Sequence, residues 1–165
     1  MPNLLLPSLT KNQVQLLVVK ARSARDKAII SIFTESGLRL CELANIKQQD
    51  MDWEAHTVRV IGKGSKEAYA PFGSLSEKYL MAWLEEHKPE AYESVWGLRP
   101  GGIQRMLRFL AEETGLSCNP HTFRRTFACL LRKQGLDSLT IKDLGRWESL
   151  EMCKDIRGRL LFKIA

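Results

Sequence analysis

The sequence lacks the marks of several protein classes. No apolar run approaches the ~18 residues that suggest a membrane span, and no positive charge precedes the short apolar run near the start, which argues against a secretory signal. The cysteines form no C-x-x-C pair; they are Cys41, Cys118, Cys129 and Cys153. Zinc and redox sites usually need such pairs, so the sequence predicts no metal site. Free thiols fit a reducing compartment, and we expect a cytoplasmic protein.

What is present is enough for one folded domain. The chain has 165 residues, of which 44% are hydrophobic and 27% charged, and this composition excludes a disordered chain. The formal net charge is +6. Between Arg99 and Lys133 there are seven basic residues and two acidic ones. This uneven distribution indicates a region that can meet a polyanion.

Helical patterns dominate the chain. Apolar spacing and capping residues predict helices that begin near Thr10, near Ser23, at Leu38, after Ser76, near Ile103, at about Thr122 and near Ser138. One segment differs: TVRVI at 57–61 and the return at 66–72 flank the turn residues 62–65, which predicts a β-hairpin. The predicted fold class is mostly α with a small antiparallel β-sheet (α+β).

Four short motifs together suit phosphodiester chemistry, although each alone is weak. They are SGLRLCEL (36–43), IGKGSK (61–66), HTFRR (121–125) and LGRW (144–147). Two guanidiniums, from Arg39 and Arg124, can grip phosphate oxygens. A lysine such as Lys63 can protonate a leaving alkoxide, and a histidine such as His121 can exchange a proton with a nucleophile. Glu42 can reach Arg39 across one helical turn. This scheme requires no metal.

In this order and at these separations, the motifs resemble the tyrosine recombinases, also called phage integrases, in their C-terminal catalytic domain. The resemblance runs over about residues 9–152. SGLRLCEL resembles the first-arginine box, VRVIGKGSKEAYAPF the family's hairpin, HTFRRTFA the H-x-x-R box and LGRWESLEM the later His or Trp segment. The resemblance implies a supporting role for Glu42 and catalytic roles for Arg39, Lys63, His121, Arg124 and Trp147.

The resemblance also implies an activity and partners. A tyrosine would attack a scissile phosphate of double-stranded DNA, leaving a 3′-phosphotyrosyl link and a free 5′ hydroxyl. The 5′ hydroxyl of a second strand would then reverse the step. The energy of the phosphodiester is retained, so no cofactor is needed. Family members act as tetramers on DNA. Phosphate contacts are expected from Lys66, Arg99, Arg105 and Arg125.

The sequence departs from the family at the nucleophile. The expected tyrosine, nine residues after Trp147, is Ile156, and the tyrosines of the chain are Tyr69, Tyr79 and Tyr92. Residues 153–165 do not resemble the family, as a frameshift or truncation near residue 153 would produce. Ser149 and Cys153 are poor substitutes, because the site suits a phenolic leaving group.

We therefore expect residues 1–165 to be a single catalytic domain, without the family's N-terminal core-binding domain, monomeric in solution and impaired in cleavage. A different class of function stays open: a catalytically inactive remnant that binds DNA or regulates an intact relative. Relaxation of supercoils, as by type IB topoisomerases, needs the same constellation and the same missing tyrosine. A helical domain of unrelated function is the remaining alternative.

Overall fold

The computed structural model describes residues 6–147, with the side chain of Lys63 excepted. The α-helices in chain order are α1 (Lys11–Lys20), α2 (Ala24–Ser36), α3 (Leu40–Ala44), α4 (Ser74–Glu86), α5 (Pro100–Thr114), α6 (Pro120–Lys133) and α7 (Ser138–Gly145). The strands are β1 (Met51–Asp52), β2 (Thr57–Ile61) and β3 (Glu67–Pro71), and two short 3-10 turns are η1 (Gln48–Asp50) and η2 (Lys63–Ser65). The predicted fold class, mostly α with a small antiparallel sheet, is confirmed.

Local capping chemistry explains where the first helices begin and end. Thr10 and Gln13 form the predicted capping box at the start of α1. The hydroxyl of Ser23 accepts a hydrogen bond from the backbone N–H of Asp26, and Gly37 ends α2 with φ 66°. A left-handed residue at this position favours glycine because it carries no Cβ. The α2 boundary, which places the first-arginine motif, was therefore readable from the sequence.

Several later boundaries differ from prediction: α4 begins at Ser74 rather than after Ser76, and α5 begins at Pro100 rather than near Ile103. The helix expected at Leu38 begins at Leu40, because Arg39 is still extended, with φ −74° and ψ 157°. The helix expected at Thr122 begins at Pro120, because Asn119 serves as its N-cap. Asp137, rather than Ser138, caps α7 by accepting a hydrogen bond from the Thr140 backbone N–H at 2.7 Å.

The hairpin prediction is confirmed and one strand is added. Strands β2 and β3 pair antiparallel, with Thr57 opposite Pro71 and Ile61 opposite Glu67. The two-residue strand β1 pairs with the outer edge of β2, which gives the order β1-β2-β3. Two residues are too few to show the alternation by which a strand is recognised in a sequence.

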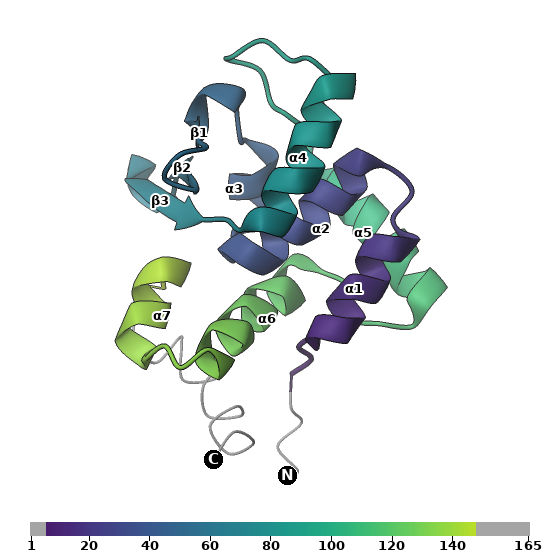
Figure 1. The fold of residues 1–165 in the computed structure, drawn as a ribbon, viewed down its shortest axis with the longest axis vertical. Helices are drawn as coiled ribbons and strands as arrows, with labels where there is room; N and C mark the ends of the chain where they lie inside the picture. The colour runs from purple at the N-terminus through teal and green to yellow at the C-terminus, as the bar shows by residue number, and fades with distance from the viewer. Residues whose placement is uncertain (1–5, 148–165) are drawn as a thin grey trace.

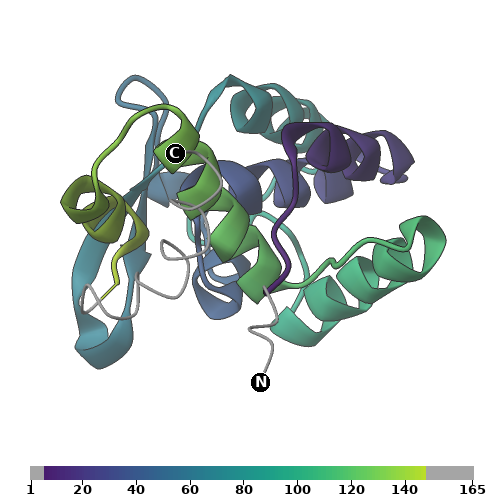
Figure 2. The ribbon, with the colours of Figure 1, turned by 90° about the horizontal axis from the view of Figure 1, so that it is seen from below.

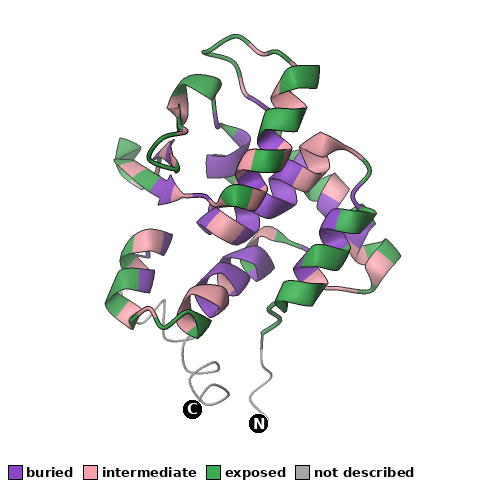
Figure 3. Ribbon diagram, in the orientation of Figure 1, coloured by how far each residue is buried: buried purple, intermediate pink, exposed green. Residues whose placement is uncertain are grey.

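The main core surrounds α2. Ile29, Ile30, Ile32 and Phe33 of this helix are all at most 1% exposed, and the Phe33 ring stacks on Phe123 of α6 with centroids 5.5 Å apart. Figure 3 shows this buried centre along α2 and α6, with the exposed residues on the outer helices. The apolar residues of α2 therefore form the centre of the main core.

A second, smaller cluster attaches α7 to α6. It consists of Phe127, Ala128, Ile141 and Trp147, with Leu131, Leu136 and Leu144 packed against it. Trp147, which follows α7, is 7% exposed. Cys129 of α6 is 4% exposed.

The arrangement brings distant motifs to one side of the molecule. The sheet lies beside α3 at one edge, and α7 lies next to the sheet below it (Figure 1). From below, α6 runs between α7 and the sheet on one side and α1 and α5 on the other (Figure 2). Over the described residues, no helix is long and apolar enough to cross a membrane.

Candidate phosphate-binding site

Arg39 stands at the junction between α2 and α3. It is the N-cap residue of α3, and its side chain is 43% exposed. Its backbone N–H donates to Glu42 Oε1 at 2.8 Å, and its Nη1 lies 3.6 Å from Glu42 Oε2. The predicted contact across one helical turn is thus present. Arg39 combines a fixed base with a guanidinium that solvent, or an anion, can reach.

Arg124 comes from α6 and is buried. It is 8% exposed, and its Nη1 donates a 2.6 Å hydrogen bond to the carbonyl oxygen of Gly37. The centre of its guanidinium lies 4.3 Å from the centroid of the Trp147 ring. A guanidinium over an indole is a favourable cation–π arrangement. Arg124 is therefore held between Trp147 and Gly37, and Gly37 stands two residues before Arg39 in the chain.

Glu42 is the acid of the cluster, with a side chain only 6% exposed. Burial opposes ionisation of this carboxyl. The charge of Arg146, hydrogen bonds from the Arg39 backbone and from Arg146, and the charge of Arg39 outweigh burial and hold the pKa of Glu42 below its ordinary value. Arg39 and Arg146 thus flank one carboxylate, and Arg124 is bonded to Gly37, two residues before Arg39, so the cluster keeps a positive balance that favours an anion.

Arg146 also belongs to this cluster, a role that was not predicted from the sequence. Its Nη2 donates to Glu42 Oε1 at 3.0 Å, and its carbonyl oxygen accepts a 3.4 Å hydrogen bond from Arg39 Nη2. The available signal was its place directly before Trp147 in the LGRW motif. Its backbone is left-handed, with φ 57° and ψ 38°.

Gly145 explains how the indole fits beside this turn. A Cβ atom at Gly145 would lie 1.7 Å from Cζ3 of Trp147. The ring therefore packs against the bare backbone of Gly145 and against Arg124. Only glycine permits this approach, and the LGRW motif needs its glycine for packing.

The hairpin brings its turn to the same cluster. A Cβ built on Gly62 would lie 3.9 Å from Glu42 Oε2, so the backbone that leads into η2 passes beside the carboxylate. Lys63 is the first residue of η2. Lys66 is exposed, and its carbonyl oxygen accepts from the Gly62 N–H at 2.8 Å. The structure therefore places the backbone of Lys63 next to the arginine cluster.

The other predicted residues lie further out. His121 is exposed in the first turn of α6, one turn before Arg124. Arg99 and Arg105 are exposed at the start and in the middle of α5. Arg125 donates from Nε to the carbonyl oxygen of Pro7 at 2.8 Å. The expected nucleophile position, Ile156, lies outside the described residues, as do Ser149, Cys153 and the tail 153–165. Within residues 6–147 there is no group of three metal-ligating side chains.

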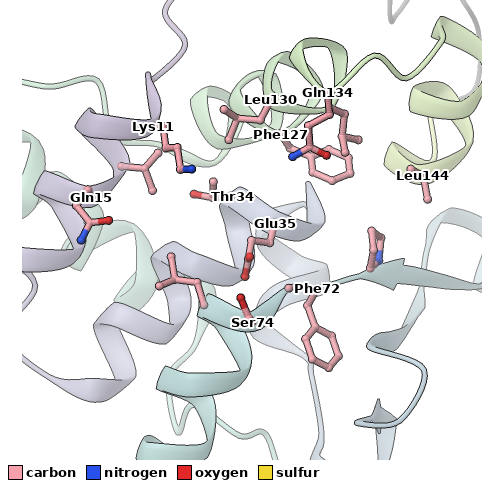
Figure 4. A pocket seen from close by; sticks show the side chains of 15 residues that line it. Lys11, Gln15, Thr34, Glu35, Phe72, Ser74, Phe127, Leu130, Gln134 and Leu144 are labelled. Atoms are coloured by element: carbon pink, nitrogen blue, oxygen red, sulfur yellow. The ribbon is translucent and has the colours of Figure 1, made fainter.

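A cavity of about 590 Å³ lies apart from these residues. Figure 4 shows it between α1, α2, α6, α7 and the start of α4, with Lys11, Thr34, Glu35 and Phe127 at its walls. None of the predicted catalytic residues lines it. The phosphate-binding candidate is instead the open surface where Arg39 emerges.

The fold and the cluster define a mostly helical domain with a small sheet and with arginines from distant motifs gathered around Glu42 and Gly37. Comparison with known proteins shows its family. Residues 7–156 match the phage integrase family. The tyrosine recombinase XerC of Staphylococcus aureus (strain MSSA476) is 36% identical over an alignment of 135 residues that covers 75% of this chain and 45% of the relative. The chain therefore belongs to the phage integrase family.

Solved structures share the fold. A structure of XerA recombinase has a TM-score of 0.84 at 22% identity, over 94% of this chain and 61% of that one. A post-cleavage complex of the XerH site-specific recombinase with its palindromic difH substrate has a TM-score of 0.82 at 20% identity, over 98% of this chain and 52% of that one. The chain spans about half the length of the curated relatives that it matches.

Proposed function

We propose that this chain binds double-stranded DNA and holds one backbone phosphate at the arginine cluster, as a site-specific recombinase domain does. Family membership supports the proposal, and similar folds are known from proteins solved with DNA. The single observation that carries it is that Arg124 is bonded to Gly37, two residues before Arg39, whose side chain is 43% exposed. We propose that the chain acts in the cytoplasm and is monomeric until it meets DNA.

Each residue of the site has a proposed role. Arg39 and Arg124 bind the non-bridging oxygens of the phosphate. Where a nucleophile is supplied, the same arginines would stabilise the charge that grows on the phosphoryl oxygens, Lys63 would protonate the leaving 5′ oxygen, and His121 would exchange a proton with the nucleophile. Trp147 supports Arg124 from below and offers its indole N–H to a phosphate oxygen. Glu42 holds Arg39 in place through both of its oxygens.

Cleavage requires a nucleophile that this sequence does not supply at the family position. Tyr69 is in β3 and donates its hydroxyl to Glu67 Oε1 at 3.0 Å, Tyr79 packs against the core from α4, and Tyr92 is 66% exposed beyond α4. We propose that none of them acts as the nucleophile and that the chain binds DNA without cleaving it. The phosphate site is then used for binding alone.

Exposed basic residues extend the proposed DNA contact. Lys66 lies at the hairpin turn, and Arg99 and Arg105 lie on α5. Arg125 is half-buried, and its guanidinium also donates to the Thr122 hydroxyl at 3.4 Å. Neutralising a phosphate releases a condensed counterion, so each contact makes binding more sensitive to salt. We expect weak binding that depends on salt and little on sequence.

The test combines a mobility-shift assay with a nicked suicide substrate. We expect a shifted complex at low salt and no covalent adduct. Arg39→Ala should weaken binding and reduce the slope of log affinity against log salt by about 0.9. Arg22→Ala, whose side chain is 70% exposed, is the matched control and should bind like the wild type. A covalent adduct would contradict the proposed inactivity, and unshifted DNA at low salt would contradict DNA binding.

A further inference from the structure

Arg146 occupies a backbone conformation that normally selects glycine. Its φ of 57° and ψ of 38° place it in the left-handed region, where an L side chain is strained. Its guanidinium is nevertheless 10% exposed, well inside the protein. The long charged side chain points inward. This indicates that its contacts offset the conformational cost of the strained backbone.

Two of those contacts involve Arg39, either directly or through Glu42. Arg146 Nη2 binds Glu42 Oε1 at 3.0 Å, and the same oxygen accepts the Arg39 backbone N–H at 2.8 Å. Glu42 Oε2 faces Arg39 Nη1 at 3.6 Å. The carbonyl oxygen of Arg146 also accepts a hydrogen bond from Arg39 Nη2. The side chain of Arg146 thus fixes the acid, and its backbone fixes the guanidinium that the acid holds.

The neighbouring residue does the same for the second arginine. Trp147 lies under Arg124 at 4.3 Å, and its ring is seated on Gly145. One three-residue turn at the end of α7 therefore touches both arginines of the phosphate site. It also ties them to α7, which the small cluster holds on α6.

We propose that Arg146 is a positioning residue of the phosphate site, which sets the orientation of Arg39 through Glu42 and through its own carbonyl group. The inference deepens the proposed phosphate-binding function and rests on it. In this proposal Arg146 acts through Arg39 rather than on the phosphate, because its Nη2 is engaged by Glu42, its Nη1 donates to the Leu144 carbonyl oxygen at 3.1 Å, and its Nε is buried.

The guanidinium shape matters to this role. Arg146 uses one nitrogen for Glu42 and another for Leu144, and a planar fork can serve both at once. A lysine carries the charge on a single nitrogen and cannot reproduce both directions. Arg146→Lys should therefore preserve part of the electrostatic effect on Glu42 while loosening Arg39.

The test uses NMR on the full chain with Arg146→Met, Arg146→Lys and a control. Arg132→Met is the control, because Arg132 also donates to a backbone carbonyl, that of Leu136 at 3.0 Å, without touching Glu42 or Arg39. Carboxyl carbon-13 titration follows Glu42, which faces Arg146 from the α7 turn and Arg39 from the start of its own helix. Arginine Nε–H signals follow the order of Arg39 and its response to added inorganic phosphate.

We expect the pKa of Glu42 to rise in Arg146→Met and to rise less in Arg146→Lys. In Arg146→Met, the Arg39 Nε–H signal should lose its order, and phosphate affinity should fall about tenfold, as expected when a charged hydrogen-bond partner is lost. Arg132→Met should match the wild type in all three measurements. If Arg146→Met folds and leaves both the order of Arg39 and the phosphate affinity unchanged, the positioning role is overturned. Should Arg146→Met fail to fold, Arg146→Lys decides the question in the same way.

The proposed function has its own failure mode in this experiment. If added phosphate shifts the NMR signals of neither Arg39 nor Arg124 in the wild type, the proposed phosphate site is contradicted. The order of Arg39 and the titration of Glu42 would still decide whether Arg146 positions Arg39, because both are measured without phosphate.

Discussion

The Nη1 atom of Arg124 donates a 2.6 Å hydrogen bond to the carbonyl oxygen of Gly37, across 87 positions of sequence. Gly37 ends α2 and leads directly into Arg39. The turn that presents the first arginine is therefore also the anchor of the second. The two motifs behave as one structural unit, and changes at Gly37 should be felt by both.

Gly37→Ala should be strongly destabilising. A left-handed φ costs an L residue about 1–2 kcal/mol, and the new Cβ would lie 2.4 Å from Cδ1 of Phe127, which adds overpacking. Together we expect a loss of roughly 2–4 kcal/mol in the free energy of unfolding by urea titration. Gly115→Ala is the control, since Gly115 ends α5 at φ 71° with open space around its Cβ position. Gly115→Ala should lose only the stability that corresponds to the conformational cost of a left-handed φ. Equal losses of unfolding free energy at both glycines would contradict the steric argument.

Much of this unit could be anticipated from the sequence because it rests on local signals. The capping residues Thr10 and Ser23 and the glycine at 37 act within one turn of where they stand. The contact between Arg39 and Glu42 lies within a single helical turn as well. Short-range geometry of this kind follows from helix periodicity alone.

The remainder of the site depends on tertiary packing that no local pattern encodes. Arg146 meets Glu42 across 104 positions, and nothing near Arg146 announces that its backbone is left-handed. The two-residue strand β1 forms only because β2 offers an edge to it. The roles of Lys63 and His121 stay predictions, since they concern contacts with DNA.

Glu35 provides a further long-range contact with a measurable effect. Its Oε1 accepts hydrogen bonds from the Ser76 backbone N–H at 2.7 Å and from the Ser76 hydroxyl at 2.5 Å. The N-cap residue of α4 is Gly73, which has no side chain to accept a hydrogen bond. The Glu35 carboxylate of α2 supplies that acceptor instead. Glu35→Ala should cost about 1–2 kcal/mol in chemical denaturation. Glu85→Ala, at an exposed position of α4, should cost little, and a similar loss at both sites would contradict the capping role.

The cysteines should differ in reactivity. Cys41 is exposed, whereas Cys118 and Cys129 are buried. Burial raises the pKa of the Cys118 thiol to about 12 and also raises the pKa of Cys129. A raised pKa lowers the thiolate fraction, which is the reacting species. In a Cys153→Ser background at pH 8, a thiol reagent should modify Cys41 quickly and the other two only after unfolding. Cys41→Ser should abolish the fast phase, and fast modification that persists in this variant would contradict the burial.

The ion pair of Glu42 and Arg146 should make stability depend on pH. The folded-state pKa of Glu42 lies below its ordinary value, so the ionised carboxylate stabilises the fold above the unfolded-state pKa of about 4.3. This contribution is lost as the pH falls through the folded-state pKa. Glu42→Gln should thus be less stable than the wild type at pH 7, and the gap should narrow below about pH 4.3. Urea titrations across pH 3–7 measure it, with Glu86→Gln, at an exposed position, as the control. A gap that stays constant over this range would show that Glu42 acts through packing rather than through its charge.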